Sequence, residues 1–110
     1  MYLLAMALFL RNAVWAYSKK EFAMPSPFIE SVRTHIRARN YSRRTEKTYI
    51  YWIVYYIRFH RMAHPETLGD QDIVRFLEFL AVQRNVTPAT QKTALNALMF
   101  LYKQVLKREG

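Results

Sequence analysis

The sequence contains no cysteine and only two glycines, Gly69 and Gly110. The lack of cysteine excludes disulfide bridges and cysteine-ligated zinc, and it is typical of a reducing compartment such as the cytoplasm, where we expect this protein to act. Because β-rich folds need glycine in their turns, the scarcity of glycine favours helices joined by short loops. Glycine-rich phosphate loops are also excluded, which makes nucleotide hydrolysis an unfavoured function.

Acidic residues are scarce as well, with 8 Asp and Glu against 17 Lys and Arg, for a formal net charge of +9. A folded domain with this balance is expected to bind a polyanion, either nucleic acid or an anionic membrane surface. Material for a core is abundant, because 52% of the 110 residues are hydrophobic and 15% are aromatic. The length fits one domain, and the hydrophobic content is too high for a disordered tail.

Residues 1–25 differ in composition from the rest of the chain. Residues 2–10 are apolar throughout, a run too short to span a bilayer. A signal peptide is a weaker alternative, because no basic residue precedes the apolar run. Apolar residues at helical spacing predict instead an extra N-terminal amphipathic helix in an extension over residues 1–25. Met24 as the true start of translation remains an open alternative.

Two amphipathic segments follow from residue 26. Ser26 before Pro27 is typical of an N-cap and a first helical position, and it predicts a helix that ends near Asn40. Ser42 is expected to cap a second helix that ends within residues 60–63. Its aromatic stripe predicts a place at the centre of the core. The two apolar stripes are Ile29, Val32 and Ile36, and then Tyr49, Trp52, Ile53, Tyr56 and Phe59.

Two further helices complete the predicted fold. Asp70, after Gly69, is expected to cap the third helix, with Asp72 in its first turn. Thr87 before Pro88 repeats the cap-and-proline signal and opens a fourth helix that runs to about Lys107. Their stripes are Ile73, Phe76, Leu77 and Leu80, and then Ala94, Leu95, Leu98, Leu101, Tyr102 and Val105. The sequence therefore predicts an all-α fold, a compact bundle of four main helices over residues 26–110, plus the N-terminal helix.

The positive charge is concentrated between residues 33 and 47. This stretch has one acid, Glu46, and six cations: Arg33, Arg37, Arg39, Arg43, Arg44 and Lys47. A solvated surface is the ordinary interpretation of an isolated basic pair. Cations packed this densely repel one another, however, so the arrangement is costly unless an anion is present. The cluster therefore indicates nucleic-acid binding.

Two helix starts coincide with polar and cationic side chains. A helix start presents free N–H groups and a positive dipole end, which suit a phosphate. We predict that the two starts hold the phosphate strands on either side of a groove, with base edges read by Gln91, Lys92 and Asn96 and by Arg44, Lys47 and Thr48. Each residue could equally be ordinary exposed helix surface, and Ser42 and Thr87 are expected to act as caps in any case. The predicted DNA-binding residues are Arg39, Ser42, Arg43, Arg44, Thr45, Lys47, Thr48, Thr87, Thr90, Gln91, Lys92 and Asn96.

Other candidate sites are weaker. His60 and His64 are four residues apart, but a zinc site needs further ligands and Pro65 interrupts the helix, so packing or loop hydrogen bonds are expected instead. Asp70 and Asp72 are accounted for by capping and the helix dipole. The tyrosines fall mostly on apolar stripes and are expected in the core. We therefore expect no metal, no cofactor and no catalytic residue.

An ordered series of motifs resembles the core-binding (SAM-like) domain of integron integrases, which are tyrosine recombinases of the phage integrase family. It begins with Tyr-Ser-Arg-Arg-Thr-Glu at residues 41–46 and continues through Trp-Ile at 52–53 and Phe-His at 59–60. It is densest at Asn-Val-Thr at 85–87, Ala-Leu-Asn-Ala-Leu at 94–98 and Phe-Leu-Tyr at 100–102. The resemblance covers residues 27–109.

This resemblance implies one half of a two-domain clamp that closes around DNA. The implied DNA is an attachment site, either duplex or folded single strand. The implied partners are the catalytic domain of the same enzyme and other recombinase protomers, with no membrane partner. The family's His-x-x-Arg motif is absent, because Ala38, Ala63 and Thr67 follow the three histidines at that spacing. The chain is therefore expected to bind DNA and to cleave nothing by itself.

Two other functions stay open. In a stand-alone helical regulator, the third and fourth helices would act as a helix-turn-helix, with the last helix in the major groove. In a membrane-surface or protein-interaction module, residues 1–20 would be the anchor. Substitution of Arg43 and Arg44 distinguishes the first alternative from the recombinase hypothesis, and deletion of residues 1–24 distinguishes the second.

Overall fold

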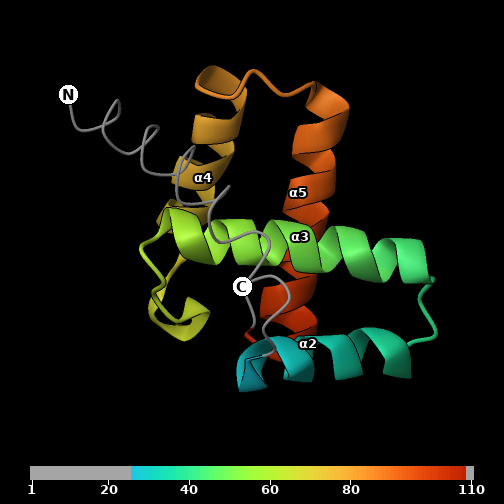
Figure 1. The fold of residues 1–110 in the computed structure, drawn as a ribbon. Helices are drawn as coiled ribbons and strands as arrows, with labels where there is room; N and C mark the ends of the chain where they lie inside the picture. Colours follow the sequence, from blue (N-terminus) through green and yellow to red (C-terminus); the bar gives the residue numbers. More distant parts are fainter. Residues whose placement is uncertain (1–25, 109–110) are drawn as a thin grey trace.

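The computed structural model describes residues 26–108 (Figure 1). The main helices are α2 (Pro27–Ala38), α3 (Arg43–Phe59), α4 (Asp70–Val82) and α5 (Pro88–Phe100). A short 3-10 helix, η1 (Pro65–Thr67), lies between α3 and α4, and a π-helical turn, η2 (Leu101–Val105), continues α5. Residues 26–108 contain no β-strand, so the predicted all-α fold with four main helices is confirmed. The predicted N-terminal helix falls within residues 1–25, outside the described residues.

Three helix starts have the predicted side-chain caps. The hydroxyl of Ser26 accepts from the N–H of Ile29 at 3.2 Å, and Ser42 and Thr87 cap α3 and α5 in the same way. The start of α4 differs from the prediction. Gly69 is the N-cap, and Asp70 is the first helical residue. The cause is Asp72, whose carboxylate accepts from the N–H of Gly69 at 2.8 Å and so stabilises the helix start from inside the first turn.

The ends of α2, α3 and the last helix lie within two residues of the predicted positions. α2 stops at Ala38, and Asn40 then turns the chain with a left-handed φ of 57°. α3 ends at Phe59, just before the predicted range. The last helix was predicted to reach about Lys107, two residues past its observed end. The π turn stops at Val105, and Lys107 has a left-handed φ of 56°, which ends the helical path.

α3 is the central element of the core, as its aromatic stripe predicted. It packs against α2, α4 and α5, and it runs across α5 in Figure 1. Eight of its residues are buried, whereas α4 and α5 each bury four. The largest fully buried side chains are Tyr56, Phe76, Ile36, Ile53, Leu80, Leu98, Leu101, Val32 and Pro65. This central position holds the start of α3 in a fixed relation to α5.

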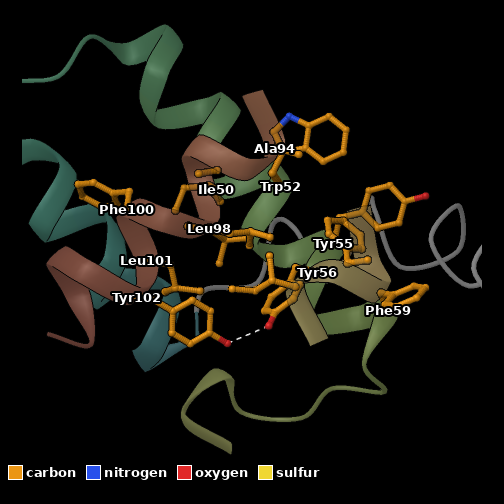
Figure 2. Close-up of a cluster of buried hydrophobic side chains, with 14 of the residues drawn as sticks. Ile50, Trp52, Tyr55, Tyr56, Phe59, Ala94, Leu98, Phe100, Leu101 and Tyr102 are labelled. Carbon is orange, nitrogen blue, oxygen red and sulfur yellow. Dashed lines mark hydrogen bonds between the residues drawn. The ribbon is translucent and has the colours of Figure 1, made fainter. Parts of the chain in front are cut away.

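A buried pair of tyrosines links three elements (Figure 2). The hydroxyls of Tyr56 on α3 and Tyr102 on η2 lie 2.9 Å apart. Tyr102 donates its hydrogen to the carbonyl oxygen of Pro65 at 2.9 Å, so Tyr56 must be the donor to Tyr102. Desolvation and this donated hydrogen bond raise the pKa of Tyr56 well above its ordinary value. The chain of hydrogen bonds therefore ties α3, η2 and η1 together inside the core.

Candidate nucleic-acid interface

The start of α3 combines a capped helix end with exposed cations. Ser42 has an extended backbone, and its hydroxyl accepts from the N–H of Thr45 at 3.1 Å. Arg43, Arg44 and Lys47 are all exposed. Because the cap occupies one of the free N–H groups, the remaining N–H groups of the first turn and the three cations are what the site offers an anion.

The start of α5 is built in the same way but with less charge. Thr87 is the N-cap, and its hydroxyl accepts from the N–H of Thr90 at 3.2 Å. No acidic residue occurs in the first turn of α5. Lys92 and Asn96 are both exposed, and because they are four residues apart they lie on one face of the helix. This face can contact a ligand that also touches the start of α5.

The starts of α3 and α5 both precede the point where these two helices cross. The rings of Tyr49 on α3 and Phe100 on α5 have centroids 5.5 Å apart, which marks where the helices meet. Arg43 precedes Tyr49 by about 9 Å along the helix axis, and Lys92 precedes Phe100 by about 12 Å. The helices run in different directions (Figure 1), so the two starts reach separate points of the surface.

The six cations of residues 33–47 do not all have the same role. Glu46 is buried on α3, with its side chain 11% exposed, and its carboxylate accepts from Arg37 at 2.9 and 3.0 Å and from Arg33 at 3.4 Å. The hydrogen bond from Arg37 holds the pKa of Glu46 below its ordinary value, and in return Glu46 raises the pKa of Arg37. Arg33 and Arg37 therefore tie α2 to α3. The exposed cations at the helix start are Arg43, Arg44 and Lys47.

Arg39 has a mixed position. Its guanidinium donates to the carbonyl oxygen of His35 at 3.0 Å and to the side chain of Gln104 at 2.7 Å, and it lies 5.6 Å from the centre of the Phe100 ring. These contacts connect the end of α2 to α5 and η2. A guanidinium has five N–H donors, and these two hydrogen bonds do not use all of them. A DNA contact of Arg39 would use the remaining donors.

Gln91 is also engaged within the protein. Its amide nitrogen donates to the carbonyl oxygen of Leu77 at 3.1 Å, a bond that joins α5 to α4. One N–H and the amide oxygen of Gln91 remain for a ligand. Thr45, Thr48 and Thr90 are only partly exposed. The structure thus brings most of the predicted residues together in two groups, one at each helix start. The exposed members are Ser42, Arg43, Arg44, Lys47, Thr87, Lys92 and Asn96.

The histidines make the loop and packing contacts expected of them. His60 has its Nε2 atom 2.9 Å from the carbonyl oxygen of Asp72, and burial lowers the pKa of its ring. The Nδ1 atom of His64 accepts from the N–H of Glu66 and so caps η1. Within residues 26–108, no three His, Cys, Asp or Glu side chains come together as metal ligands would.

One residue beside the start of α3 was missed by the sequence prediction. The tyrosines were expected mostly in the core and Tyr41 was not singled out among them, but this residue is 42% exposed. The signal was available in the sequence, because Tyr41 directly precedes the cap Ser42 and so lies outside the stripe of α3. An exposed ring beside exposed arginines is a combination that nucleic-acid surfaces use.

Comparison with known proteins assigns this architecture to a family. Residues 28–110 match the phage integrase N-terminal SAM-like domain. An integrase/recombinase of Escherichia coli and one of Pseudomonas aeruginosa are each 44% identical to this chain over 78 residues, which make up 71% of this chain and 23% of each relative. A putative integrase/recombinase of Sinorhizobium fredii is 25% identical over 93 residues, 84% of this chain and 30% of that relative.

The chain therefore belongs to the family of phage integrase N-terminal SAM-like domains. It spans about a quarter of the length of the curated relatives from Escherichia coli and Pseudomonas aeruginosa. None of the described helices is both long enough and apolar enough to cross a membrane.

Proposed function

We propose that residues 26–110 are the DNA-binding, core-binding domain of a site-specific tyrosine recombinase of the integron integrase type. The observation that carries this proposal is the set of exposed cations at the start of α3. Arg33, Arg37 and Arg75 form ion pairs within residues 26–108, whereas none is found there for Arg43 or Arg44. Unpaired cations at a helix start suit phosphate groups, which would complete their charge balance.

The two helix starts have different roles in this proposal. Arg43, Arg44 and Lys47 contact the phosphates of one strand, together with the first-turn N–H groups of α3. The start of α5 contacts the other strand, with Thr90 and Lys92 nearest the backbone. In this proposal Asn96, on the same face of α5 as Lys92, contacts a base edge, where asparagine suits adenine. Most of the affinity comes from phosphates, and most of the sequence preference comes from α5.

The proposal for the rest of the enzyme is based on the relatives of this chain. Their names describe them as integrases or recombinases, and this chain spans about a quarter of their length. We infer that strand cleavage belongs to a catalytic domain of the parent enzyme and that this domain supplies one side of a clamp around attachment-site DNA. Its partners are then that catalytic domain and neighbouring recombinase protomers.

A titration of the 110-residue chain tests the proposal. Fluorescence anisotropy is followed at several salt concentrations with three probes: an integron attachment-site duplex, a hairpin of one strand of that site, and a shuffled duplex. DNA binding predicts that log K falls with log salt, with a slope of about −0.9 for each phosphate contacted. Site recognition further predicts tighter binding to the attachment-site probes than to the shuffled duplex. Affinity that does not change with salt would contradict the phosphate grip.

A further inference from the structure

Tyr41 presents an aromatic ring at the surface, beside the proposed DNA contact. It lies in the loop between α2 and α3, directly before the cap Ser42. Its ring stands edge-on to Tyr49, with centroids 6.2 Å apart at 86°, and it is tilted against Phe100 at 5.7 Å and 49°. Since Tyr49 and Phe100 also contact each other at 5.5 Å, the three rings form a cluster in which Tyr41 is the outermost member.

The backbone also holds Tyr41 in place. The left-handed turn at Asn40, with φ of 57°, redirects the chain after α2, and the N–H of Tyr41 points back to the carbonyl oxygen of Ile36 at 3.4 Å. Tyr41 is 42% exposed, but its ring is held in place by the backbone and by its contacts with Tyr49 and Phe100. A ring held in this way loses little conformational freedom when a flat ligand stacks on it.

The surroundings of the ring are strongly basic. Arg43 and Arg44 follow it by two and three residues and are exposed, and the guanidinium of Arg39 lies 5.6 Å from the centre of Phe100 in the same cluster. Proteins that bind unpaired nucleic acid combine these two elements, a positive surface that follows the backbone and aromatic rings on which bases stack. Within a duplex the faces of each base are covered by its neighbours, so such a ring can only stack on a base that has left the helix.

We propose that Tyr41 is a stacking site for an unpaired nucleobase, placed next to the phosphate contact at Arg43 and Arg44. This inference rests on the proposed DNA binding and deepens it. It identifies the ligand of this part of the surface as a base that is bulged, flipped or at a strand end. Phosphates at the start of α3 bring the strand to the protein, and the ring of Tyr41 binds a base next to those phosphates.

Three probes of one sequence test this inference on the 110-residue chain. The first is a duplex with one unpaired 2-aminopurine, the second carries an abasic position in place of that base, and the third is fully paired. We expect the chain to bind the first probe more tightly than the abasic one and to quench 2-aminopurine fluorescence. Tyr41→Leu, which keeps an apolar contact with Tyr49 and Phe100, should remove the preference, a loss of about 5- to 100-fold in affinity for the first probe alone.

Matched variants separate stacking from other effects. Tyr41→Phe should keep both the preference and the quenching, because it changes only the hydroxyl. Tyr51→Leu makes the same change at an exposed tyrosine within α3 and should also keep them. Equal binding of the bulged and abasic probes by the unaltered chain would overturn the inference without the need of any variant. Loss of the preference in Tyr51→Leu but not in Tyr41→Leu would also overturn it.

The two proposals fail in different ways. If none of the three probes binds in a salt-dependent manner, the proposed DNA binding is wrong. If all three bind, and Arg43→Ala with Arg44→Ala weakens all of them while the bulge gives no advantage, DNA binding stands and the stacking site is wrong.

Discussion

The Nε atom of Arg37 on α2 donates to the carboxylate of Glu46 on α3 at 2.9 Å. This contact divides the basic stretch of the sequence in two, because it leaves Arg37 and Arg33 with an internal partner and the start of α3 with exposed cations. A surface that looks uniformly positive in the sequence therefore has a structural part and a part available to a ligand.

Glu46→Gln should lower the free energy of unfolding by about 1 kcal/mol, since it removes the charge from a nearly buried acceptor of charge-assisted hydrogen bonds. Urea denaturation at neutral pH measures the loss. Glu30→Gln is the matched control, because Glu30 pairs with Arg33 from an exposed position and should change stability less. An equal effect of the two variants would contradict a special role for Glu46.

The same carboxylate predicts a pH dependence of stability. Because the folded state holds the pKa of Glu46 below its ordinary value of 4.5, the contribution is fully present above pH 4.5 and is lost as the pH falls through the lower folded pKa. Unfolding free energies measured from neutral pH to about pH 2 should therefore fall less steeply for Glu46→Gln than for the unaltered chain. Parallel curves would show that Glu46 titrates normally in the folded protein.

The buried tyrosine pair predicts an order of stabilities. Tyr102→Phe leaves both the hydroxyl of Tyr56 and the carbonyl oxygen of Pro65 without their partner, and it should cost about 2 to 3 kcal/mol. Tyr56→Phe removes only the terminal donor and should cost about 1 kcal/mol. Both variants remove one hydroxyl group, and urea denaturation of the two checks this order. A larger loss for Tyr56→Phe would contradict the central place of Tyr102, which holds both hydrogen bonds.

The cap of α5 should contribute to stability as well as to the site. Thr87→Ala removes the acceptor for the N–H of Thr90 and should lower the unfolding free energy by about 1 kcal/mol. Thr87→Ser retains the hydroxyl and is the control, with an expected loss close to zero. Thermal unfolding followed by circular dichroism makes the measurement, and equal melting temperatures for all three chains would show that the cap is not used.

On α5, Lys92 and Asn96 should affect affinity in different ways. Lys92→Ala should reduce the salt slope by about 0.9, as expected for one phosphate contact, whichever DNA sequence is used. Asn96→Ala should weaken binding to the attachment site by about 1 to 3 kcal/mol while leaving the shuffled duplex unaffected. Competition titrations with both duplexes check this. If Asn96→Ala changes the affinity for neither duplex, Asn96 does not contact DNA and is ordinary exposed helix surface.

The sequence predicted three of the four helix starts correctly, because Ser26, Ser42 and Thr87 act through local hydrogen bonds within a single turn. The start of α4 was missed by one residue, since glycine at an N-cap depends on a side chain three positions later, here that of Asp72. The tertiary contacts between helices could not be predicted. The bonds from Arg37 to Glu46 and from Gln91 to Leu77 join residues 9 and 14 positions apart, and they form only once the helices pack.

The position of Tyr41 also depends on tertiary contacts that the sequence does not show. Its neighbours Tyr49 and Phe100 come from two different helices, so the sequence pattern could not show that its ring is held at the surface. The charge cluster itself was visible in the sequence, but the packing of α2 on α3 determines which of its members stay exposed.

The most direct test of the central claim, that the start of α3 binds DNA phosphates, compares two double variants of equal charge. Arg43→Ala with Arg44→Ala removes the proposed contact, whereas Arg75→Ala with Arg84→Ala removes two exposed arginines from α4 and the loop after it. The quantity measured is the slope of log K against log salt with the attachment-site duplex. We expect the first pair to make the slope less negative by about 1.8, at about 0.9 per phosphate, and the second pair to leave it nearly unchanged. Equal slopes for the two variants would show that only net charge matters and would contradict the claim.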